Sequence, residues 1–280
     1  MNILPPGHDP TAPHVLISGK GNYPVLLAQR AKAAGVPLRL VAFEGETPEP
    51  LFQSFPEEHR TRIKVGQLGK LLKALKQFWA KYAIMAGQIT PGKLFKGLHP
   101  DLKAVSLLAS LKEKNAETIF GAIAEEITNV GTTLLDARAF MEEDLATEGI
   151  LVGKFPCKNQ PWLDHGIRIA TEISRLDIGQ SAIVSKGTVL AVEAFDGTDA
   201  LIDYCAKFKT KHAILVKTAK PDQDYRFDVP VFGEKTLEKL DAADIRTAAI
   251  AAGSTLLLDK AKLLGKAKEL KINLVGFPER

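Results

Sequence analysis

The sequence predicts an α/β protein with an N-terminal Rossmann-like domain and a second α/β domain that contains a mixed sheet. In the first half, continuous apolar runs of strand length alternate with amphipathic helical segments. A glycine-containing loop, Gly19-Lys20-Gly21, follows the first of these runs. In the second half, two short apolar runs bracket the turn Ser185-Lys186-Gly187, which predicts a β-hairpin. A length of 280 residues favours two domains over one.

The N-terminal domain is expected to span residues 14–144, after a loose proline-rich tail at residues 1–13. Its first strand is indicated by a continuous apolar run, and the helix that follows the glycine loop stops at Gly35. A strand, a glycine-containing loop, a helix and a second strand, in this order, open a Rossmann-like half. The expected strands are 14–18, 38–43, 62–65, 83–87 and 132–136, and the expected helices are 25–34, 71–79, 102–111, 118–128 and 137–144.

The second domain is expected to span residues 162–280. We place the junction at 145–161, where the chain has no clean period and contains two glycines and two prolines. The expected helices are 162–176, 198–208, 236–243 and 260–271. Besides the hairpin, the expected strands are 213–216, 272–275 and either 248–251 or 255–258.

Composition narrows the class of protein and its partners. The net charge of +4, from 37 basic and 33 acidic residues, suits an anionic substrate or membrane surface and is too weak to indicate nucleic acid. Two cysteines form no disulfide framework or zinc site, so a reducing cytoplasm is expected. We see no signal peptide and no run of the ~20 apolar residues that a transmembrane helix needs. Membrane contact is therefore expected to be peripheral.

The first glycine-containing turn of the first half is a candidate for phosphate binding. Gly19, Gly21 and Asn22 lie where a diphosphate can approach the amides at a helix N-terminus. The alternative is a tight turn that needs glycine only for its backbone angles. The full dinucleotide fingerprint is missing. Lys70 closes a second turn, Gly66–Lys70, and is most simply part of a solvated helix face. Gly87 ends the strand 83–87, where ligands of such sheets bind.

Carboxylates gather at the exit of the predicted hairpin. Glu193, Asp196 and Asp199 lie within seven residues and repel one another unless a cation or a positively charged partner sits among them. Gly197 and Thr198 are placed to begin the next helix, which presents amide donors to an anion. The alternative is a solvated acidic turn with an ordinary cap. Two further polar residues, Asp177 and Gln180, stand at the entrance of the hairpin.

Asp228 is the sharpest single candidate for chemistry. It lies between Phe227 and Val229 in a strand-like run that Pro230 follows. A carboxylate among apolar neighbours is costly to bury, so it should face a cation, a lysine or a cleft. The alternative is a structural turn or salt-bridge residue. Lysines for phosphate charge lie close in sequence, at positions 217 and 220.

Several short stretches, spread over both halves of the chain, resemble one known protein family. They are Ile17–Gly21, Gly66–Lys70, Met85–Gly87, Ser174–Gln180, Val189–Ala194, Gly197–Asp199, Lys217–Pro221 and Arg226–Pro230. Together they resemble the bacterial UDP-2,3-diacylglucosamine pyrophosphatases of the LpxI type, over nearly the whole chain beyond the tail. One departure is Lys20, which interrupts a run of three small residues that the family often has after its first strand.

The resemblance implies Mg²⁺-dependent hydrolysis of the pyrophosphate of UDP-2,3-diacylglucosamine to 2,3-diacylglucosamine 1-phosphate (lipid X) and UMP, in lipid A biosynthesis. Asp228 would be catalytic, as a metal ligand or as the group that orients water, with Lys217 and Lys220 neutralising phosphate charge. Glu193 and Asp199 are the further candidates for the metal environment. The implied substrate-binding residues are Gly19, Gly21, Asn22, Lys70, Gly87, Asp177, Gln180, Gly197 and Thr198.

The expected partners are a lipid-linked nucleotide sugar, held between the domains, and the cytoplasmic face of the inner membrane. No nucleic acid is expected, and a homo-oligomer is left open. Two other functions are also left open. A Rossmann-type NAD(P) oxidoreductase would explain the first half but leaves the hairpin carboxylates and Asp228 without a role. A non-catalytic protein that binds nucleotide sugars or lipids would need the same pocket without a metal.

Overall fold

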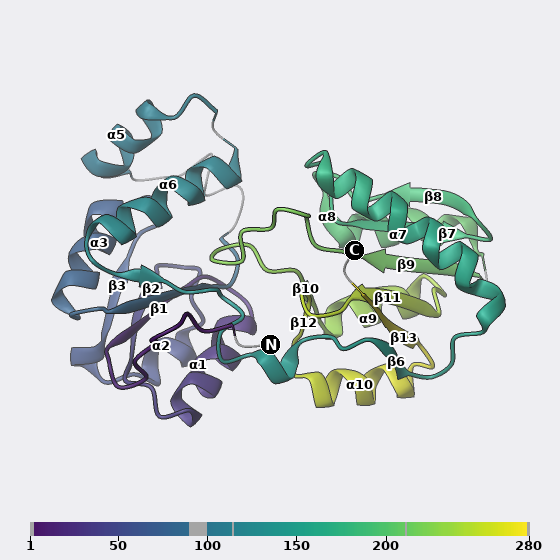
Figure 1. Cartoon of the computed structure of the whole chain (residues 1–280), viewed down its shortest axis with the longest axis horizontal. Helices are drawn as coiled ribbons and strands as arrows, with labels where there is room; N and C mark the ends of the chain where they lie inside the picture. Colours follow the sequence, from purple (N-terminus) through teal and green to yellow (C-terminus); the bar gives the residue numbers. More distant parts are fainter. Residues whose placement is uncertain (1–2, 90–99, 114, 211, 279–280) are drawn as a thin grey trace. The chain divides into compact units, whose positions relative to one another are not determined.

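The computed structural model describes residues 3–89, 100–113, 115–210 and 212–278. The chain forms two compact units (Figure 1). The first comprises Met1–Glu142 together with the short segment Tyr225–Asp228. The second comprises Glu143–Asp224 and Val229–Arg280. The first unit therefore takes four residues from the second half of the sequence.

The first unit is built on a five-stranded parallel sheet in the order β3-β2-β1-β4-β5. This is the strand order of a Rossmann half, which confirms the predicted fold class. The central strand β1 is buried along its whole length, as expected for a parallel strand covered on both faces. The strands are β1 (His14–Ser18), β2 (Leu38–Phe43), β3 (Arg60–Ile63), β4 (Tyr82–Ala86) and β5 (Thr133–Leu134).

Helices cover this sheet. Val15 and Ile17 of β1 share an apolar core with α3 and α6, while α1 contributes the buried Leu27 and Ala31 and packs on β1, β2 and β4. Pro24 at the start of α1 and the apolar stripe of α3 agree with the predicted helices. The helices are α1 (Tyr23–Ala33), α2 (Glu49–Gln53), η1 (Glu57–His59), α3 (Leu68–Gln77), α5 (Leu102–Ser110) and α6 (Ala116–Asn129).

The helix expected over 137–144 does not form. Residues 137–140 make turns and only a short 3₁₀ helix follows, η2 (Glu142–Asp144). The amide of Ala137 donates to the carbonyl of Tyr225, 2.8 Å away, and Phe140 has a positive φ of 66°. A contact with a distant part of the chain has thus replaced the local helical bonding that the pattern predicts.

The tail is tied to the first unit where the sequence predicts a loose segment. His8 Nε2 lies 2.8 Å from His14 Nε2, and the Asp9 amide donates to the hydroxyl of Tyr82 at 3.0 Å. The two imidazole rings pack against Tyr82 and Phe140. Four prolines do not prevent order here, because aromatic contacts with β1 and β4 hold the segment.

The second unit contains a mixed sheet, as the sequence predicts. Its six strands have the order β6-β13-β11-β9-β7-β8. The inner strands β13, β11 and β9 are parallel, and β6, β7 and β8 join antiparallel. The strands are β6 (Gly149–Val152), β7 (Ser181–Ser185), β8 (Thr188–Val192), β9 (Ala213–Lys217), β11 (Thr247–Ala251) and β13 (Asn273–Phe277). The segment placed at the junction thus includes an edge strand, β6.

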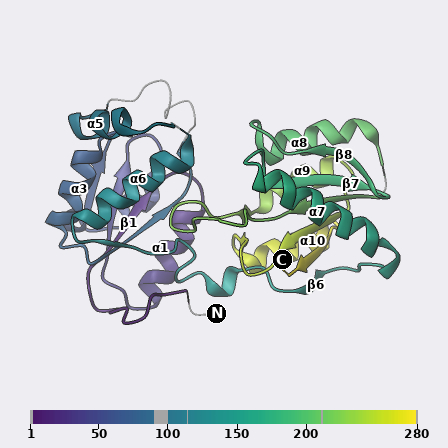
Figure 2. The ribbon, with the colours of Figure 1, turned by 45° about the horizontal axis from the view of Figure 1, so that its top comes forward.

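Helices cover both faces of this sheet (Figures 1 and 2). The helix α7 packs through Leu163, Ile167 and Ala170 on one face, and α8, α9 and α10 share the core of the other. Both segments offered as alternative strands form strands, since β12 pairs with β10 in a separate parallel pair. The remaining elements are η3 (Cys157–Asn159), α7 (Gln160–Arg175), α8 (Gly197–Cys205), η4 (Ala206–Phe208), β10 (Val231–Phe232), α9 (Glu234–Ala242), β12 (Leu256–Leu257) and α10 (Lys260–Glu269).

The predicted hairpin is confirmed as β7–β8. Its two connecting residues, Lys186 and Gly187, both have positive φ values, 47° and 83°. This is the type I′ geometry that matches the twist of two antiparallel strands. The hairpin brings the segments before β7 and after β8 to the same end of the sheet, where the predicted polar residues lie.

Candidate functional site

A chain of polar side chains lies at the end of β9 in the second unit. Lys217 is the last residue of this strand, and only 8% of it is exposed. Its Nζ donates to Thr198 Oγ1 at 3.3 Å, and Thr198 Oγ1 donates to Glu193 Oε1 at 3.0 Å. The structure therefore brings together a lysine, a hydroxyl and a carboxylate from three separate predicted stretches.

Backbone pairing explains this convergence. Ser181 at the start of β7 pairs with Lys217 at the end of β9, and the Glu193 amide donates to the Ser181 carbonyl at 2.7 Å. A Cβ on Gly179 would lie 2.3 Å from the carbonyl oxygen of Glu193, so only glycine permits this approach. Gly197, with a φ of 81°, then turns the chain into α8, whose first turn carries Thr198.

A second polar group lies beside the first. Lys220 forms an ion pair with Asp177, and its amide donates to Gln223 Oε1 at 2.9 Å. Gln180 Nε2 donates to the same Gln223 oxygen at 3.2 Å. The Gln180 carbonyl also accepts the amide of Thr218 at 2.9 Å, which joins this group to the end of β9. Asp177, Gln180 and Lys220, all predicted for the site, are thus brought together.

Asp199 lies in a different ion pair. Its Oδ2 is 2.5 Å from Nζ of Lys235 at the start of α9. The hydrogen bond from Lys235 to Asp199 raises the pKa of that lysine, with the charge of Asp199 adding to the effect. A metal-binding role for Asp199 would require this pair to open.

Glu193 is the carboxylate that best fits a cation. Its Oε2 is buried and has no hydrogen-bond partner, an arrangement that is costly for an oxygen acceptor. Among the described residues no group of three or more His, Cys, Asp or Glu side chains is placed to hold a metal ion. Mg²⁺ is often held by one or two carboxylates together with substrate phosphates and water. One free carboxylate oxygen fits that mode.

The predicted glycines of the first unit have a structural role. A Cβ on Gly19 would lie 2.5 Å from the Gln88 carbonyl oxygen, and one on Gly87 would lie 2.6 Å from the Lys20 carbonyl oxygen. The chains at the ends of β1 and β4 continue to pair, with the Lys20 amide donating to Gln88 O at 2.8 Å. These glycines therefore allow two backbones to approach closely. Gly21, with a φ of 98° and free space around it, lies exposed beside Asn22.

The helix start near Lys70 already has an anionic partner. Asp101 Oδ2 accepts the amides of Gly69 at 2.7 Å and Lys70 at 3.3 Å, and Asp101 Oδ1 caps α5 through the Ala104 amide at 3.0 Å. The Lys70 side chain is exposed. A carboxylate thus already satisfies amide donors at the start of α3.

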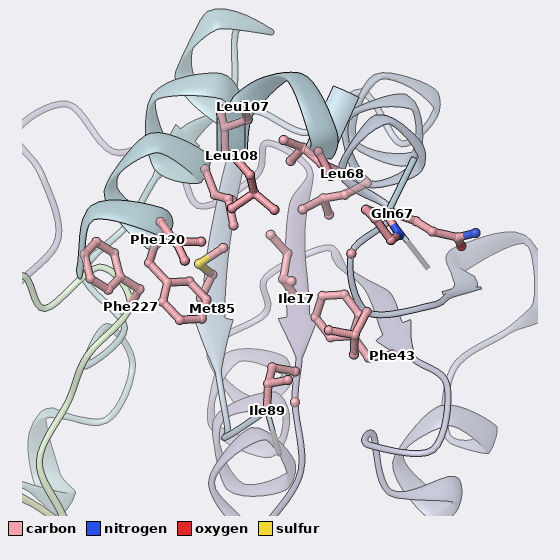
Figure 3. Close-up of a pocket in the computed structure, with 18 of the residues that line it drawn as sticks. Ile17, Phe43, Gln67, Leu68, Met85, Ile89, Leu107, Leu108, Phe120 and Phe227 are labelled. Carbon is pink, nitrogen blue, oxygen red and sulfur yellow. The ribbon is translucent and has the colours of Figure 1, made fainter. Parts of the chain in front are cut away.

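An apolar cavity of about 160 Å³ lies in the first unit (Figure 3). Ile17 and Met85, from β1 and β4, line it at the carboxyl end of the sheet, where Rossmann-like domains bind ligands. Figure 3 shows Phe120 and Phe227 side by side at one edge of the cavity. The other lining residues are Gly19, Phe43, Val65, Gly66, Gln67, Leu68, Leu71, Ala86, Gly87, Ile89, Pro100, Ala104, Leu107, Leu108, Ile119 and Ile123.

Asp228 directly follows one of the cavity residues. The ring of Phe227 stacks on that of Phe120 with centroids 5.7 Å apart and an interplanar angle of 21°. Asp228 is exposed and belongs to the first unit. The prediction of a strand-like run is wrong here, since residues 225–227 form a turn and β10 begins at Val231. The segment packs on α6 through Phe227 and does not pair as a strand.

Gly19 and Gly87 of the predicted substrate-binding set line the cavity, but sequence reasoning missed its apolar wall. Phe120 and Ile123 of α6 and Leu107 and Leu108 of α5 lie in helices for which the sequence predicts no site role. The available signal was an excess of apolar side chains on these two short helices. Nothing in the local pattern separates such an excess from ordinary core packing.

The chain matches two family models, the LpxI N-terminal domain over residues 14–144 and the LpxI C-terminal domain over residues 147–275. It is 30% identical over 276 residues to UDP-2,3-diacylglucosamine pyrophosphatase LpxI of Caulobacter vibrioides. That alignment covers 93% of this chain and 96% of the Caulobacter protein. Within the described residues, no helix is long and apolar enough to cross a membrane.

Proposed function

Because the chain belongs to the LpxI family, we propose that it hydrolyses the pyrophosphate of UDP-2,3-diacylglucosamine, releasing 2,3-diacylglucosamine 1-phosphate and UMP. The reaction belongs to lipid A biosynthesis. The observation that carries the choice of substrate is the apolar cavity at the carboxyl end of the first sheet. Its lining suits a hydrocarbon chain, and the two acyl chains of this substrate supply one.

The cavity also separates this function from the oxidoreductase alternative. A dinucleotide presents its pyrophosphate to helix amides at the sheet end of a Rossmann-like domain. In this chain Asp101 accepts the amides at the start of α3, and apolar side chains line the neighbouring space. A dinucleotide pyrophosphate would instead use the amides at the start of α1, after Gly19–Asn22, so the apolar lining is what separates the two functions. These features favour an acylated substrate.

The second unit supplies groups for the phosphates. Lys217 and Lys220 would neutralise charge on the phosphoryl oxygens, and Thr198 would hold the Lys217 ammonium in place through the observed hydrogen bond. Glu193 would hold Mg²⁺ through its free Oε2. When bound, Mg²⁺ would supply further neutralisation of the phosphates. Asp228 would orient the attacking water or add a ligand to the ion.

Attack is proposed at the phosphorus on the sugar side, with UMP leaving. The water then needs an acceptor for its proton and an in-line approach. Asp228 is exposed, so its carboxylate can accept that proton without any rearrangement that uncovers it. The substrate is membrane-resident, so we propose that the protein contacts the cytoplasmic face of the inner membrane peripherally.

The test uses purified protein with UDP-2,3-diacylglucosamine while Mg²⁺ is titrated, and in parallel with NAD(P)H. Release of UMP that rises with Mg²⁺ is the expected result. Retention of the lipid without UMP release would indicate the binding protein, and a change in nicotinamide absorbance would indicate the oxidoreductase. Either of these outcomes would overturn the proposed function.

A further inference from the structure

The segment Tyr225–Asp228 is fastened to the first unit at its beginning. The carbonyl of Tyr225 accepts the amide of Ala137 at 2.8 Å, and the Arg138 guanidinium carbon lies 3.4 Å from the centroid of the Tyr225 ring. Stacking of a guanidinium on an aromatic face is a favourable contact that strengthens when the pair is shielded from water. Arg138 is buried, with 9% of the residue exposed.

Arg138 is itself held rigidly. Its Nε and one terminal nitrogen donate to the carboxylate of Asp136 at 3.0 and 2.6 Å, a two-point contact that fixes the plane of the guanidinium. The carbonyl of Ala137 accepts a hydrogen bond from the buried hydroxyl of Tyr23. Burial raises the pKa of that tyrosine, so it stays a donor. Asp136 and Tyr23 therefore both hold the segment 136–138, on which the Tyr225 ring packs.

Asp228 follows this attachment directly along the chain. It lies on no helix or strand, because residues 225–227 form a turn and the next strand begins three residues later. The preceding residue, Phe227, stacks on Phe120 of α6. A catalytic carboxylate must be positioned to within a few tenths of an ångström of its productive place, so it needs rigid support. The contacts of Tyr225 and Phe227 give such support to the turn.

We infer that Arg138 is a positioning residue: through the ring of Tyr225 it holds the turn that sets Asp228 for hydrolysis. The inference rests on the proposed function, since it takes Asp228 as the catalytic carboxylate. Arg138 acts on the substrate through this turn. Loosening the attachment should therefore lower kcat more than it weakens substrate binding.

The main test replaces Tyr225, because this leaves the Arg138–Asp136 ion pair intact. Tyr225→Ala should lower kcat at least tenfold and change KM less than twofold. It should also speed hydrogen exchange of the Ala137 amide at least tenfold, since that amide donates to Tyr225 O. Tyr225→Phe keeps the ring and should leave kcat and the exchange rate within twofold of the unaltered chain.

A second variant and a matched control separate positioning from general loosening. Arg138→Lys keeps the charge but loses the planar stack and the two-point contact, so kcat should fall at least threefold. Phe52→Ala is the control. It removes another ring of the same unit that lies under arginines, Arg62 at 3.9 Å and Arg60 at 4.5 Å. Arg62 likewise pairs with a carboxylate, Glu49. This control should keep kcat.

Different outcomes would overturn the inference and the proposed function. An active chain in which Tyr225→Ala keeps kcat, or loses no more than Phe52→Ala does, would overturn the inference. So would a loss of kcat with the Ala137 amide still protected, because the turn would then still be attached. Absence of hydrolysis in the unaltered chain would instead overturn the proposed function, and the role of Arg138 would fall with it.

Discussion

Filling the apolar cavity should lower kcat/KM for the diacyl substrate and leave kcat/KM for a short-chain analogue nearly unchanged. Ala104 lines the cavity from α5 and is buried, with 7% of the residue exposed. The change Ala104→Phe adds a phenyl ring to this wall. An engineered apolar cavity of about 150 Å³ holds benzene, and the cavity here measures about 160 Å³. The added ring therefore fits the space and takes the place of a hydrocarbon chain.

The size of the effect follows from the buried hydrocarbon. If the ring displaces about four methylene groups at about 0.8 kcal/mol each, the loss is about 3 kcal/mol. At about 1.4 kcal/mol per factor of ten, kcat/KM for the diacyl substrate should fall roughly 100-fold. A diacetyl analogue has no chain to place in the cavity, so its kcat/KM should stay within a factor of two to three.

The assay measures UMP release from both substrates at several concentrations. Val105→Phe is the control, because Val105 is the next residue of α5, is 49% exposed and does not line the cavity. Equal losses for the long-chain and short-chain substrates would refute the reasoning, since a cavity for acyl chains must discriminate between them. Unchanged activity of Ala104→Phe on the diacyl substrate would refute it as well.

Three further predictions concern the site, the membrane and the first strand. Asp228→Ala should abolish hydrolysis while the protein stays folded and retains the lipid, because Asp228 is exposed and supports no core; near-normal turnover would count against its assignment. Cell fractionation should find the protein soluble or released from membranes by salt, and recovery only with detergent would contradict this. Burial lowers the pKa of His14 below its ordinary value of 6.5. The unfolded chain therefore binds a proton at higher pH than the folded chain does, and the free energy of unfolding should fall as pH drops below about 6.5. Urea unfolding between pH 7 and pH 5 measures this fall, and an equal fall in His14→Phe would show that another group is responsible.

Local sequence patterns predicted most of the fold, because periodicity and turn chemistry are local properties. The run at residues 14–18 became β1 with every residue buried, and Lys186-Gly187 formed the turn of the hairpin. The error at 137–144 has a non-local cause. The amide of Ala137 bonds to Tyr225, 88 positions along the chain, and no window of neighbouring residues contains that information.

The candidate site was only partly predictable, because some of its contacts are also non-local. The sequence singled out Lys217, Thr198 and Glu193 from separate stretches, and strand pairing joined them. It did not indicate that Asp199 pairs with Lys235 of another helix, nor that Asp101 occupies the amides at the start of α3. Both facts depend on how helices pack against each other, which side-chain type alone does not determine.

The most direct test of the central claim is to run the reaction in ¹⁸O-water with Mg²⁺ and to weigh both products by mass spectrometry. Hydrolysis of the pyrophosphate with attack on the sugar-side phosphorus predicts ¹⁸O in 2,3-diacylglucosamine 1-phosphate and none in UMP. Label in UMP would contradict the proposed point of attack while leaving the substrate in place. Failure to form either product from UDP-2,3-diacylglucosamine would contradict the proposed function itself.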